Sequence, residues 1–172
     1  MNTSHVPRPT SQPMRPKRVL FVCTGNSCRS VMAEHLLRVL LQRAGRDEIE
    51  VESAGVFAIS GMGSTRETQR VLQDVGADCS THRTRMLTAD MVEAADLIFV
   101  MESFQLDEVV RRVPAAKGKA HLLKRYGVES PGTVAQPNIP DPIGKPLEVY
   151  EVCFAEIREA VERIVHALGS HT

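Results

Sequence analysis

Short apolar runs alternate along this chain with longer segments that repeat apolar residues at helical spacing. The runs with the character of buried strands are residues 17–22, 50–53, 96–101 and 120–123. Helical patterns occupy residues 30–44, 65–75, 88–95, 104–113 and 147–168. Strands that alternate with helices in this way form parallel sheets, because each helix provides the crossover between strands. The sequence therefore predicts one α/β domain, with a four-stranded parallel sheet and helices on both faces.

Two of these segments also predict what is buried. The run Asp96–Met101 (DLIFVM) is apolar on both faces, as a central strand of a parallel sheet should be. The methionines are expected in the core. The last helix is expected to bury a stripe of residues at helical spacing, namely Val149, Cys153, Ile157, Val161, Ile164 and Leu168.

The first 16 residues differ from the rest of the chain. They contain proline, serine, threonine and arginine but no apolar stretch, which a secretory signal needs. We interpret residues 1–16 as a disordered tail and residues 17–170 as the folded domain. No apolar run approaches the roughly 20 residues that span a bilayer, so no membrane association is expected.

Charge and cysteine content narrow the class of protein. The chain has 21 basic and 21 acidic residues, a balance that gives no indication of nucleic-acid binding. Its cysteines, at positions 23, 28, 79 and 153, are too few for a disulfide-stabilised scaffold and form no paired metal-ligand motif. We therefore expect a cytoplasmic protein with a reactive thiol.

The segment Cys23–Ser30 (CTGNSCRS) follows the first predicted strand and precedes the first predicted helix. Cysteine, five residues and arginine form the minimal phosphatase pattern, which is weak without context. Cys79 and Arg85 have the same spacing, but no glycine lies between them and no strand ends at Cys79. We interpret Cys79 as a buried structural residue. Cys23 instead lies where open parallel sheets bind their ligands, at the carboxyl end of a strand.

The chemistry of this segment suits a phosphate group. Backbone N–H groups and the positive end of the following helix can together hold a dianion and favour a thiolate at Cys23. Gly25 permits backbone conformations closed to other residues, and Asn26 is among the few side chains that tolerate the left-handed region. The Arg29 guanidinium can bind two phosphate oxygens at once, and Ser30 can donate to the thiolate. The predicted phosphate-binding residues are Thr24, Gly25, Asn26, Ser27, Cys28 and Ser30.

These residues resemble a known family. The segment from Val22 to Ser30, with Met32-Ala33-Glu34 after it, is similar to the low-molecular-weight protein tyrosine phosphatases. The likeness continues through four later segments, namely 52–55, 80–85, 95–98 and 141–142. Val31 departs from the family's usual proline, with little effect expected because proline there only pre-sets the helix. The resemblance implies Cys23 as nucleophile, a cysteinyl-phosphate intermediate, phosphorylated protein substrates, and neither metal nor cofactor. We expect a monomer.

The proton donor is expected in the long segment Arg125–Pro146, which is rich in proline. Structureless segments of this length are uncommon in compact domains and usually functional. Asp141 lies between two prolines that stiffen its backbone, and it matches the general acid of the family. The resemblance also implies that Cys28 protects Cys23 from over-oxidation, with a packing role as the alternative. His82 is expected to support loop structure.

The choice of substrate depends on three positions. Tyrosine-directed members have an aromatic pair after Asp-Pro, whereas Ile143-Gly144-Lys145 follows Pro142 here. Ser27 stands where those enzymes usually have a bulky aliphatic residue. The stretch from Ser53 to Ala58, which includes Phe57, resembles the bacterial protein-arginine phosphatases. We favour phosphoarginine and keep phosphotyrosine open, with Ser27, Phe57 and Ile143 as specificity residues.

Two other functions remain as alternatives. Arsenate reductases share the loop but need further cysteines after the third strand, and residues 97–104 contain none. A phosphoprotein-binding module is the second alternative, although such a module would not need Cys23, Arg29 and Asp141 together.

Overall fold

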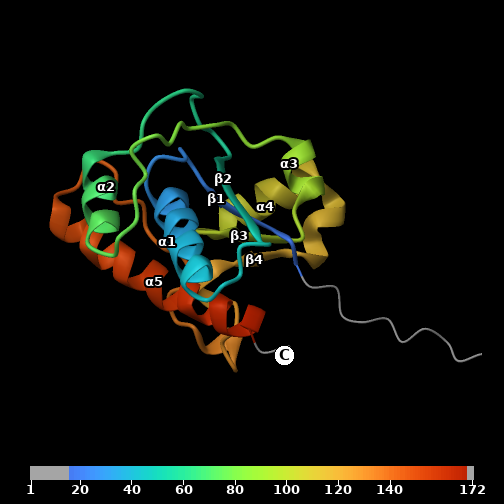
Figure 1. Ribbon diagram of the computed structural model, residues 1–172. Helices are drawn as coiled ribbons and strands as arrows, with labels where there is room; N and C mark the ends of the chain where they lie inside the picture. Colours follow the sequence, from blue (N-terminus) through green and yellow to red (C-terminus); the bar gives the residue numbers. More distant parts are fainter. Residues whose placement is uncertain (1–15, 170–172) are drawn as a thin grey trace, which may run out of the picture.

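The computed structural model describes residues 16–169. Its sheet consists of β1 (Arg18–Cys23), β2 (Glu50–Gly55), β3 (Leu97–Val100) and β4 (Ala120–Leu122). The strands lie in the order β2-β1-β3-β4, and every neighbouring pair is parallel. The predicted four-stranded parallel sheet is confirmed, and β1 and β3 are its two central strands (Figure 1).

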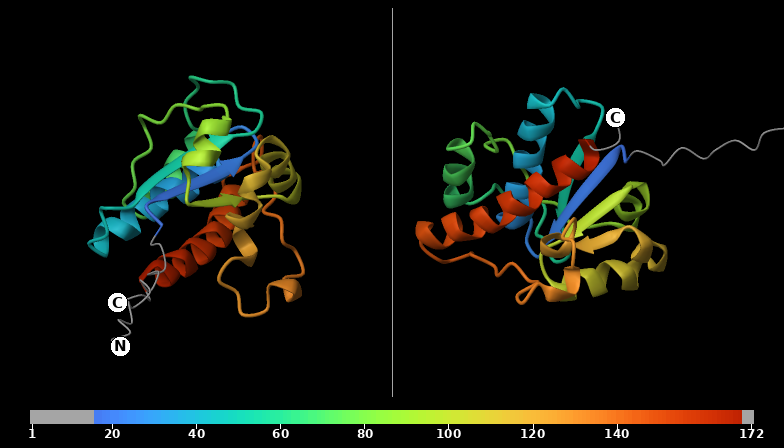
Figure 2. Two further views of the ribbon diagram at one scale, coloured as in Figure 1. Left: turned by 90° about the vertical axis from the view of Figure 1, so that its right-hand side faces the viewer. Right: turned by 90° about the horizontal axis from the view of Figure 1, so that it is seen from below.

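Helices cover both faces of the sheet, as predicted. The α-helices are α1 (Arg29–Arg43), α2 (Arg66–Gln73), α3 (Ala89–Ala94), α4 (Ser103–Arg112) and α5 (Leu147–Gly169). Figure 2 shows α1, α2 and α5 on one side of the sheet and α3 and α4 on the other. Short 3₁₀ turns occupy Pro114–Gly118, Leu123–Arg125 and Pro131–Thr133.

Alternation along the central strands separates two apolar cores. Phe21 and Phe99 pack with α1 and α5 on one face. Leu20 and Ile98 pack with α3 and α4 on the other. All four side chains are at most 1% exposed, as expected for central strands buried on both faces. The sheet is therefore a rigid support whose carboxyl edge carries the loops.

Local signals explain where the helices begin. Thr65 is the N-cap of α2 and accepts a hydrogen bond from the Thr68 N–H, and Thr88 caps α3 through the Met91 N–H. The α4 helix begins with a capping box in which Glu102 and Gln105 each bond the other's backbone. The long segment 125–146 holds no α-helix or strand, only the last residue of the 3₁₀ turn Leu123–Arg125 and the 3₁₀ turn Pro131–Thr133.

Some expectations need correction. Val149 is 39% exposed, and the neighbouring Tyr150 is buried at 1% in its place. The other five residues of the predicted stripe are buried, so the buried face of α5 is as predicted but begins at Tyr150. Met62 and Met86 are exposed although the methionines were expected in the core. The β2 strand also continues to Gly55, two residues beyond its predicted end.

The predicted boundaries of the folded domain lie close to the limits of the described residues. The predicted tail at 1–16 lies outside the described residues except for Pro16, and so does residue 170 at the end of the predicted domain. Both boundaries stay predictions. Within residues 16–169, no helix is both long and apolar enough to cross a bilayer.

Candidate active site

The segment singled out in the sequence connects the central strand β1 to α1. Cys23 is the last residue of β1 and pairs with Gly55 of β2, while Arg29 is the first residue of α1. The loop between them lies at the carboxyl edge of the parallel sheet, where ligands of such folds bind. The predicted location is confirmed.

The thiol of Cys23 is surrounded by hydrogen-bonding groups. Its Sγ atom lies 3.0 Å from the Ser30 hydroxyl and accepts a hydrogen bond from the backbone N–H of Asn26 at 3.3 Å. Cys23 is 2% exposed. The Asn26 N–H therefore donates to this buried sulfur, and the Ser30 hydroxyl lies within hydrogen-bond distance of it.

Asn26 holds the loop in shape. Its φ of 55° places it in the left-handed region, as predicted, and its side chain is fully buried. The Nδ2 group donates to the hydroxyls of Ser30 and Ser53, each at 2.9 Å, and Oδ1 accepts from the Arg85 N–H at 3.0 Å. Every hydrogen-bonding group of the amide therefore has a partner, which fixes the loop conformation.

The glycine that the loop requires is Gly55 rather than Gly25. A β-carbon at Gly25 would meet only Ser27 Oγ, at 3.8 Å, and its φ is not positive, so the loop does not use the conformational freedom that Gly25 permits. A β-carbon at Gly55 would lie 2.5 Å from the Thr24 carbonyl oxygen and 3.0 Å from the Asn26 nitrogen. Gly55 thus allows β2 to support the loop directly from below.

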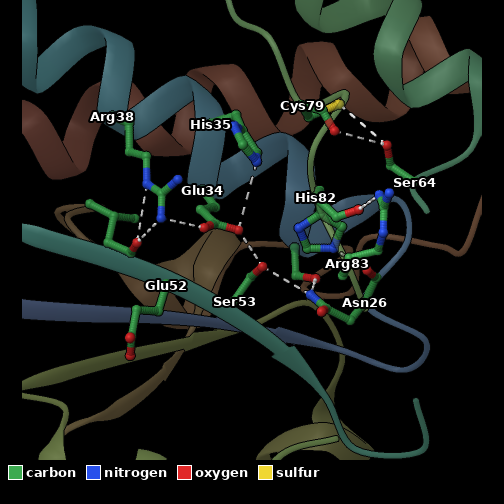
Figure 3. Close-up of polar contacts among 12 residues, drawn as sticks. Asn26, Glu34, His35, Arg38, Glu52, Ser53, Ser64, Cys79, His82 and Arg83 are labelled. Carbon is green, nitrogen blue, oxygen red and sulfur yellow. Dashed lines mark hydrogen bonds and ion pairs between the residues drawn. The ribbon is translucent and has the colours of Figure 1, made fainter. Parts of the chain in front are cut away.

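A chain of polar contacts runs from the loop into the protein (Figure 3). Ser53 Oγ, which accepts from Asn26, donates in turn to Glu34 Oε2. The other oxygen of Glu34 pairs with Arg38 Nη2 at 2.7 Å, one turn further along α1. The 5% exposed Glu34 carboxylate is therefore both paired and hydrogen-bonded, as a buried charge must be.

His82 supports the same loop from outside, as expected. Its Nε2 lies 2.9 Å from the backbone carbonyl oxygen of Asn26. Because a carbonyl only accepts hydrogen bonds, Nε2 is the protonated nitrogen of the ring.

Arg29 is 1% exposed and is held by three groups. Its Nη1 donates to Glu102 at the start of α4 and to the Ile139 carbonyl at 2.7 Å. Its Nη2 lies 3.4 Å from Asp141 Oδ2. Within the described residues, the buried Nε atom of Arg29 has no hydrogen-bond partner, which leaves a donor for an anion in the loop.

Asp141 reaches the loop through the anchored segment before it. The Ile139 N–H donates to the carbonyl of Met101, the residue after β3, and the Ile139 carbonyl accepts from Arg29. Asp141 is thereby placed beside Arg29 at the open side of the site, where its side chain is 38% exposed. Its Oδ1 accepts from the Ile143 N–H at 3.1 Å. The structure thus brings Cys23, Arg29 and Asp141 to one loop.

The predicted site residues Thr24, Ser27, Phe57 and Ile143 differ in how the structure holds and exposes them. Gln105 Nε2 donates to the Thr24 hydroxyl at 3.2 Å. Ser27 is half-buried, and its carbonyl accepts from the Thr65 N–H at 3.2 Å. Phe57 is joined to the loop by its N–H, which donates to the Thr24 carbonyl at 3.0 Å, while its ring is 59% exposed. Ile143 is 54% exposed, two residues after Asp141.

Cys28 lies on the inner side of the loop. Its Sγ is 3.5 Å from the Tyr150 hydroxyl and 3.7 Å from Thr65 Oγ1. Burial raises the pKa of Tyr150 well above its ordinary value, so this phenol stays protonated. Cys28 is a free thiol, as are the other three cysteines.

The thiols of Cys79 and Cys153 are expected to be unreactive. Burial raises the pKa of Cys153 to about 12, and it also raises the pKa of Cys79. A buried thiol with a raised pKa is a poor nucleophile, which supports the structural interpretation of Cys79.

Sequence reasoning missed three residues that support the loop, namely Glu34, Ser53 and Glu102. Ser53 accepts from Asn26, Glu102 pairs with Arg29, and Glu34 acts through Ser53, yet none was given a role. Glu34 and Ser53 lay within the segments that carried the family resemblance, so a signal for them was present. Glu102 had no such signal, because its contact with Arg29 joins positions 73 residues apart.

Comparisons with known proteins agree with this geometry. Residues 18–172 match the family described as low molecular weight phosphotyrosine protein phosphatase. A protein-arginine-phosphatase of Geobacillus stearothermophilus is 36% identical, with 89% of this chain and 97% of that protein covered. A probable low molecular weight protein-tyrosine-phosphatase, EpsP of Ralstonia nicotianae, is 37% identical, with 89% of this chain and 99% of that protein covered.

Solved structures give the same result. The tyrosine phosphatase AmsI of Erwinia amylovora superposes with a TM-score of 0.78 at 32% identity, covering 90% of this chain and 94% of that one. A cysteine-to-serine variant of YwlE arginine phosphatase carries a phosphorylated active site serine. It superposes with a TM-score of 0.80 at 28% identity, covering 90% of this chain and 97% of that one.

Fold, loop and relatives together define a cysteine-dependent phosphatase. The chain belongs to the low molecular weight phosphotyrosine protein phosphatase family. Its relatives are protein phosphatases, so the arsenate reductase and binding-module alternatives are not favoured.

Proposed function

We propose that this enzyme is a protein-arginine phosphatase in which Cys23 is the nucleophile, Arg29 binds the phosphoryl oxygens and Asp141 is the general acid and base. The other loop residues, Thr24, Gly25, Asn26, Ser27, Cys28 and Ser30, surround the phosphate. These roles are supported by the positions of the three residues, because Cys23 and Arg29 lie at the two ends of the connection between β1 and α1 and Asp141 lies 3.4 Å from Arg29.

In the first step, Cys23 sulfur attacks phosphorus in line with the leaving group, so that an S–P bond forms and the P–N bond breaks. Asp141 gives its proton to the departing guanidino nitrogen. Arg29 and the loop N–H groups stabilise the charge on the phosphoryl oxygens. In the second step, water attacks phosphorus, Asp141 takes its proton, and the S–P bond breaks to release phosphate.

The preference for phosphoarginine rests on the Ser27 hydroxyl. Ser27 is half-buried within the loop and places a polar group where a tyrosine-directed site would have an aliphatic wall. Beyond Asp141 the chain offers Ile143 and Gly144, which cannot sandwich a phenyl ring as an aromatic pair can. A guanidino group is polar and is recognised by hydrogen bonds instead.

Initial rates on matched phosphoarginine and phosphotyrosine peptides test this preference, with Cys23→Ser as the blank. We expect a higher kcat/KM for phosphoarginine. Ser27→Ile should lower the phosphoarginine to phosphotyrosine ratio by tenfold or more, because the hydrogen bond to the guanidino group is lost. Ser27→Thr, which keeps the hydroxyl, is the matched control. Faster phosphotyrosine turnover by the wild type would refute the preference.

The role of Asp141 has its own test. Asp141→Asn should slow turnover by roughly 10²–10⁴-fold, since general acid catalysis contributes about that much. A substrate with a very good leaving group should be affected much less. An unchanged rate on both substrates would remove Asp141 from the mechanism.

The enzyme is further expected to act as a monomer in the cytoplasm, on phosphorylated proteins. Four free thiols among the described residues support a reducing compartment. Sedimentation of the full chain tests the oligomeric state.

A further inference from the structure

A cluster of three metal-ligating side chains lies behind the phosphate loop. Glu34 and His35 are adjacent on α1, and His82 comes from the segment between α2 and α3 (Figure 3). One nitrogen of each imidazole and one carboxylate oxygen lie within 4.8 Å of one another. The phosphatase chemistry derived above does not use His35 at all.

This set of donors selects a class of cation. Two imidazoles and one carboxylate form the ligand set of many open zinc sites, in which a water takes the fourth position. Calcium and magnesium prefer oxygen ligands and are disfavoured by two imidazoles. A borderline cation such as Zn²⁺ therefore fits these three residues best.

The orientation of His82 suits metal binding. Its Nε2–H donates to the Asn26 carbonyl at 2.9 Å, so Nδ1 carries the lone pair that a metal needs. Imidazoles that bind metals usually donate their other N–H to a carbonyl or carboxylate, which fixes the tautomer and the ring. His82 has this arrangement in the folded protein.

The donor atoms would have to move only slightly closer together to bind one zinc ion. His35 Nε2 lies 4.0 Å from Glu34 Oε2. Two ligands at about 2.1 Å from a tetrahedral zinc are about 3.4 Å apart, so side-chain rotations suffice. Arg38 pairs with the other carboxylate oxygen, Oε1, and can stay there while Oε2 turns to the metal. Both histidines are partly exposed, which leaves an entry path.

The cluster is directly connected to the nucleophile. Glu34 Oε2 accepts from Ser53, Ser53 accepts from Asn26, and Asn26 shares Ser30 with the Cys23 thiol. A cation on Oε2 competes with the Ser53 hydroxyl for that oxygen and draws it toward the two imidazoles. The loop then loses one of the contacts that hold Asn26, and with it the alignment of Ser30 on the sulfur.

We propose that Glu34, His35 and His82 form an inhibitory zinc site whose occupation loosens the phosphate loop. The inhibition part of this proposal rests on the proposed phosphatase function of the chain, whereas the zinc-binding part does not. The two halves of the proposal are therefore measured separately.

Binding is measured by calorimetric titration of the full chain with Zn²⁺ in the Cys23→Ser background, which removes the reactive thiolate as a competing ligand. We expect one zinc per chain at this site. Adding His35→Ala removes a direct ligand. It should therefore weaken zinc binding by at least as much as the loss of an outer-shell partner does, which is roughly 10–100-fold. His35→Gln keeps the side-chain volume and should behave alike. His166→Ala, which changes an exposed histidine on α5, should bind as the parent does.

Inhibition is measured on the chain with Cys23 intact. Zinc should lower kcat tenfold or more, and raising the substrate concentration should not relieve the effect. His35→Ala should keep the metal-free rate and require at least tenfold more zinc for half inhibition. Equal zinc affinity in the His35 variants and their parent would refute the site. Binding without inhibition would refute the coupling. Inhibition that substrate relieves and that His35→Ala leaves unchanged would also refute the coupling, and it would place the inhibitory zinc on Cys23.

Discussion

A β-carbon on Gly55 would lie 2.5 Å from the carbonyl oxygen of Thr24, so the second strand and the phosphate loop are in direct backbone contact. The Val56 and Phe57 N–H groups continue this contact by donating to the carbonyls of Cys23 and Thr24. The first part of the loop, from Cys23 to Asn26, is therefore supported by β2 and the residues after it.

Gly55→Ala should destabilise the protein by about 1–3 kcal/mol, because neither the Thr24 carbonyl nor the Asn26 nitrogen can move without displacing the loop. Its kcat should fall as well. Urea unfolding and initial rates measure both. Gly63→Ala is the control, since a β-carbon there meets nothing within 4 Å. Equal stability of the two variants would contradict the close contact.

Ser30→Ala should slow turnover and alkylation of Cys23 by iodoacetamide, each roughly 10–100-fold. The reason is that a hydrogen bond to a charged group contributes about 1.5–3 kcal/mol, and the hydroxyl lies 3.0 Å from the sulfur. Ser64→Ala is a matched control, because that hydroxyl lies 3.4 Å from the sulfur of Cys79 instead. Unchanged alkylation in Ser30→Ala would show that the hydroxyl does not stabilise the thiolate.

Iodoacetamide at pH 7 should leave Cys79 and Cys153 unmodified in the folded protein. Burial raises the pKa of both thiols, that of Cys153 to about 12, so neither forms thiolate at this pH. Peptide mass spectrometry before and after denaturation measures the labelling. Rapid labelling of Cys153 in the native protein would contradict its burial.

Stability should fall between pH 7.5 and 5. Burial lowers the pKa of His121 below its ordinary value of 6.5, and its ring packs against Tyr126 at 5.1 Å. The unfolded chain therefore binds more protons below pH 6.5, and stability is lost as the pH falls through 6.5 toward the folded pKa. The urea midpoint should fall less in His121→Gln than in the wild type. His166→Gln, at an exposed site, should show the same fall in urea midpoint between pH 7.5 and 5 as the wild type.

Cys28 should permit recovery from peroxide. If it forms a disulfide with Cys23, dithiothreitol restores activity in the wild type, whereas Cys28→Ala is over-oxidised and stays inactive. Cys153→Ala, which removes another buried thiol, should recover as the wild type does. Equal recovery of Cys28→Ala would leave Cys28 with a packing role beside Tyr150.

The sequence by itself determined the sheet, the helices and the position of the loop. These depend on contiguous patterns, such as the apolar run before Cys23 and the helical spacing after Arg29. The left-handed Asn26 is also a local property, because few other side chains tolerate that conformation.

Only the tertiary structure decided what supports the loop. Arg29 contacts Glu102 and the Ile139 carbonyl, which are 73 and 110 residues away along the chain. His82 meets Asn26 across 56 residues and lies beside Glu34 and His35 only because α1 and the segment before α3 pack together. The turn of α5 that buries Tyr150 rather than Val149 is likewise set by its neighbours. No local pattern specifies such pairings, since they arise when separate elements pack around one core.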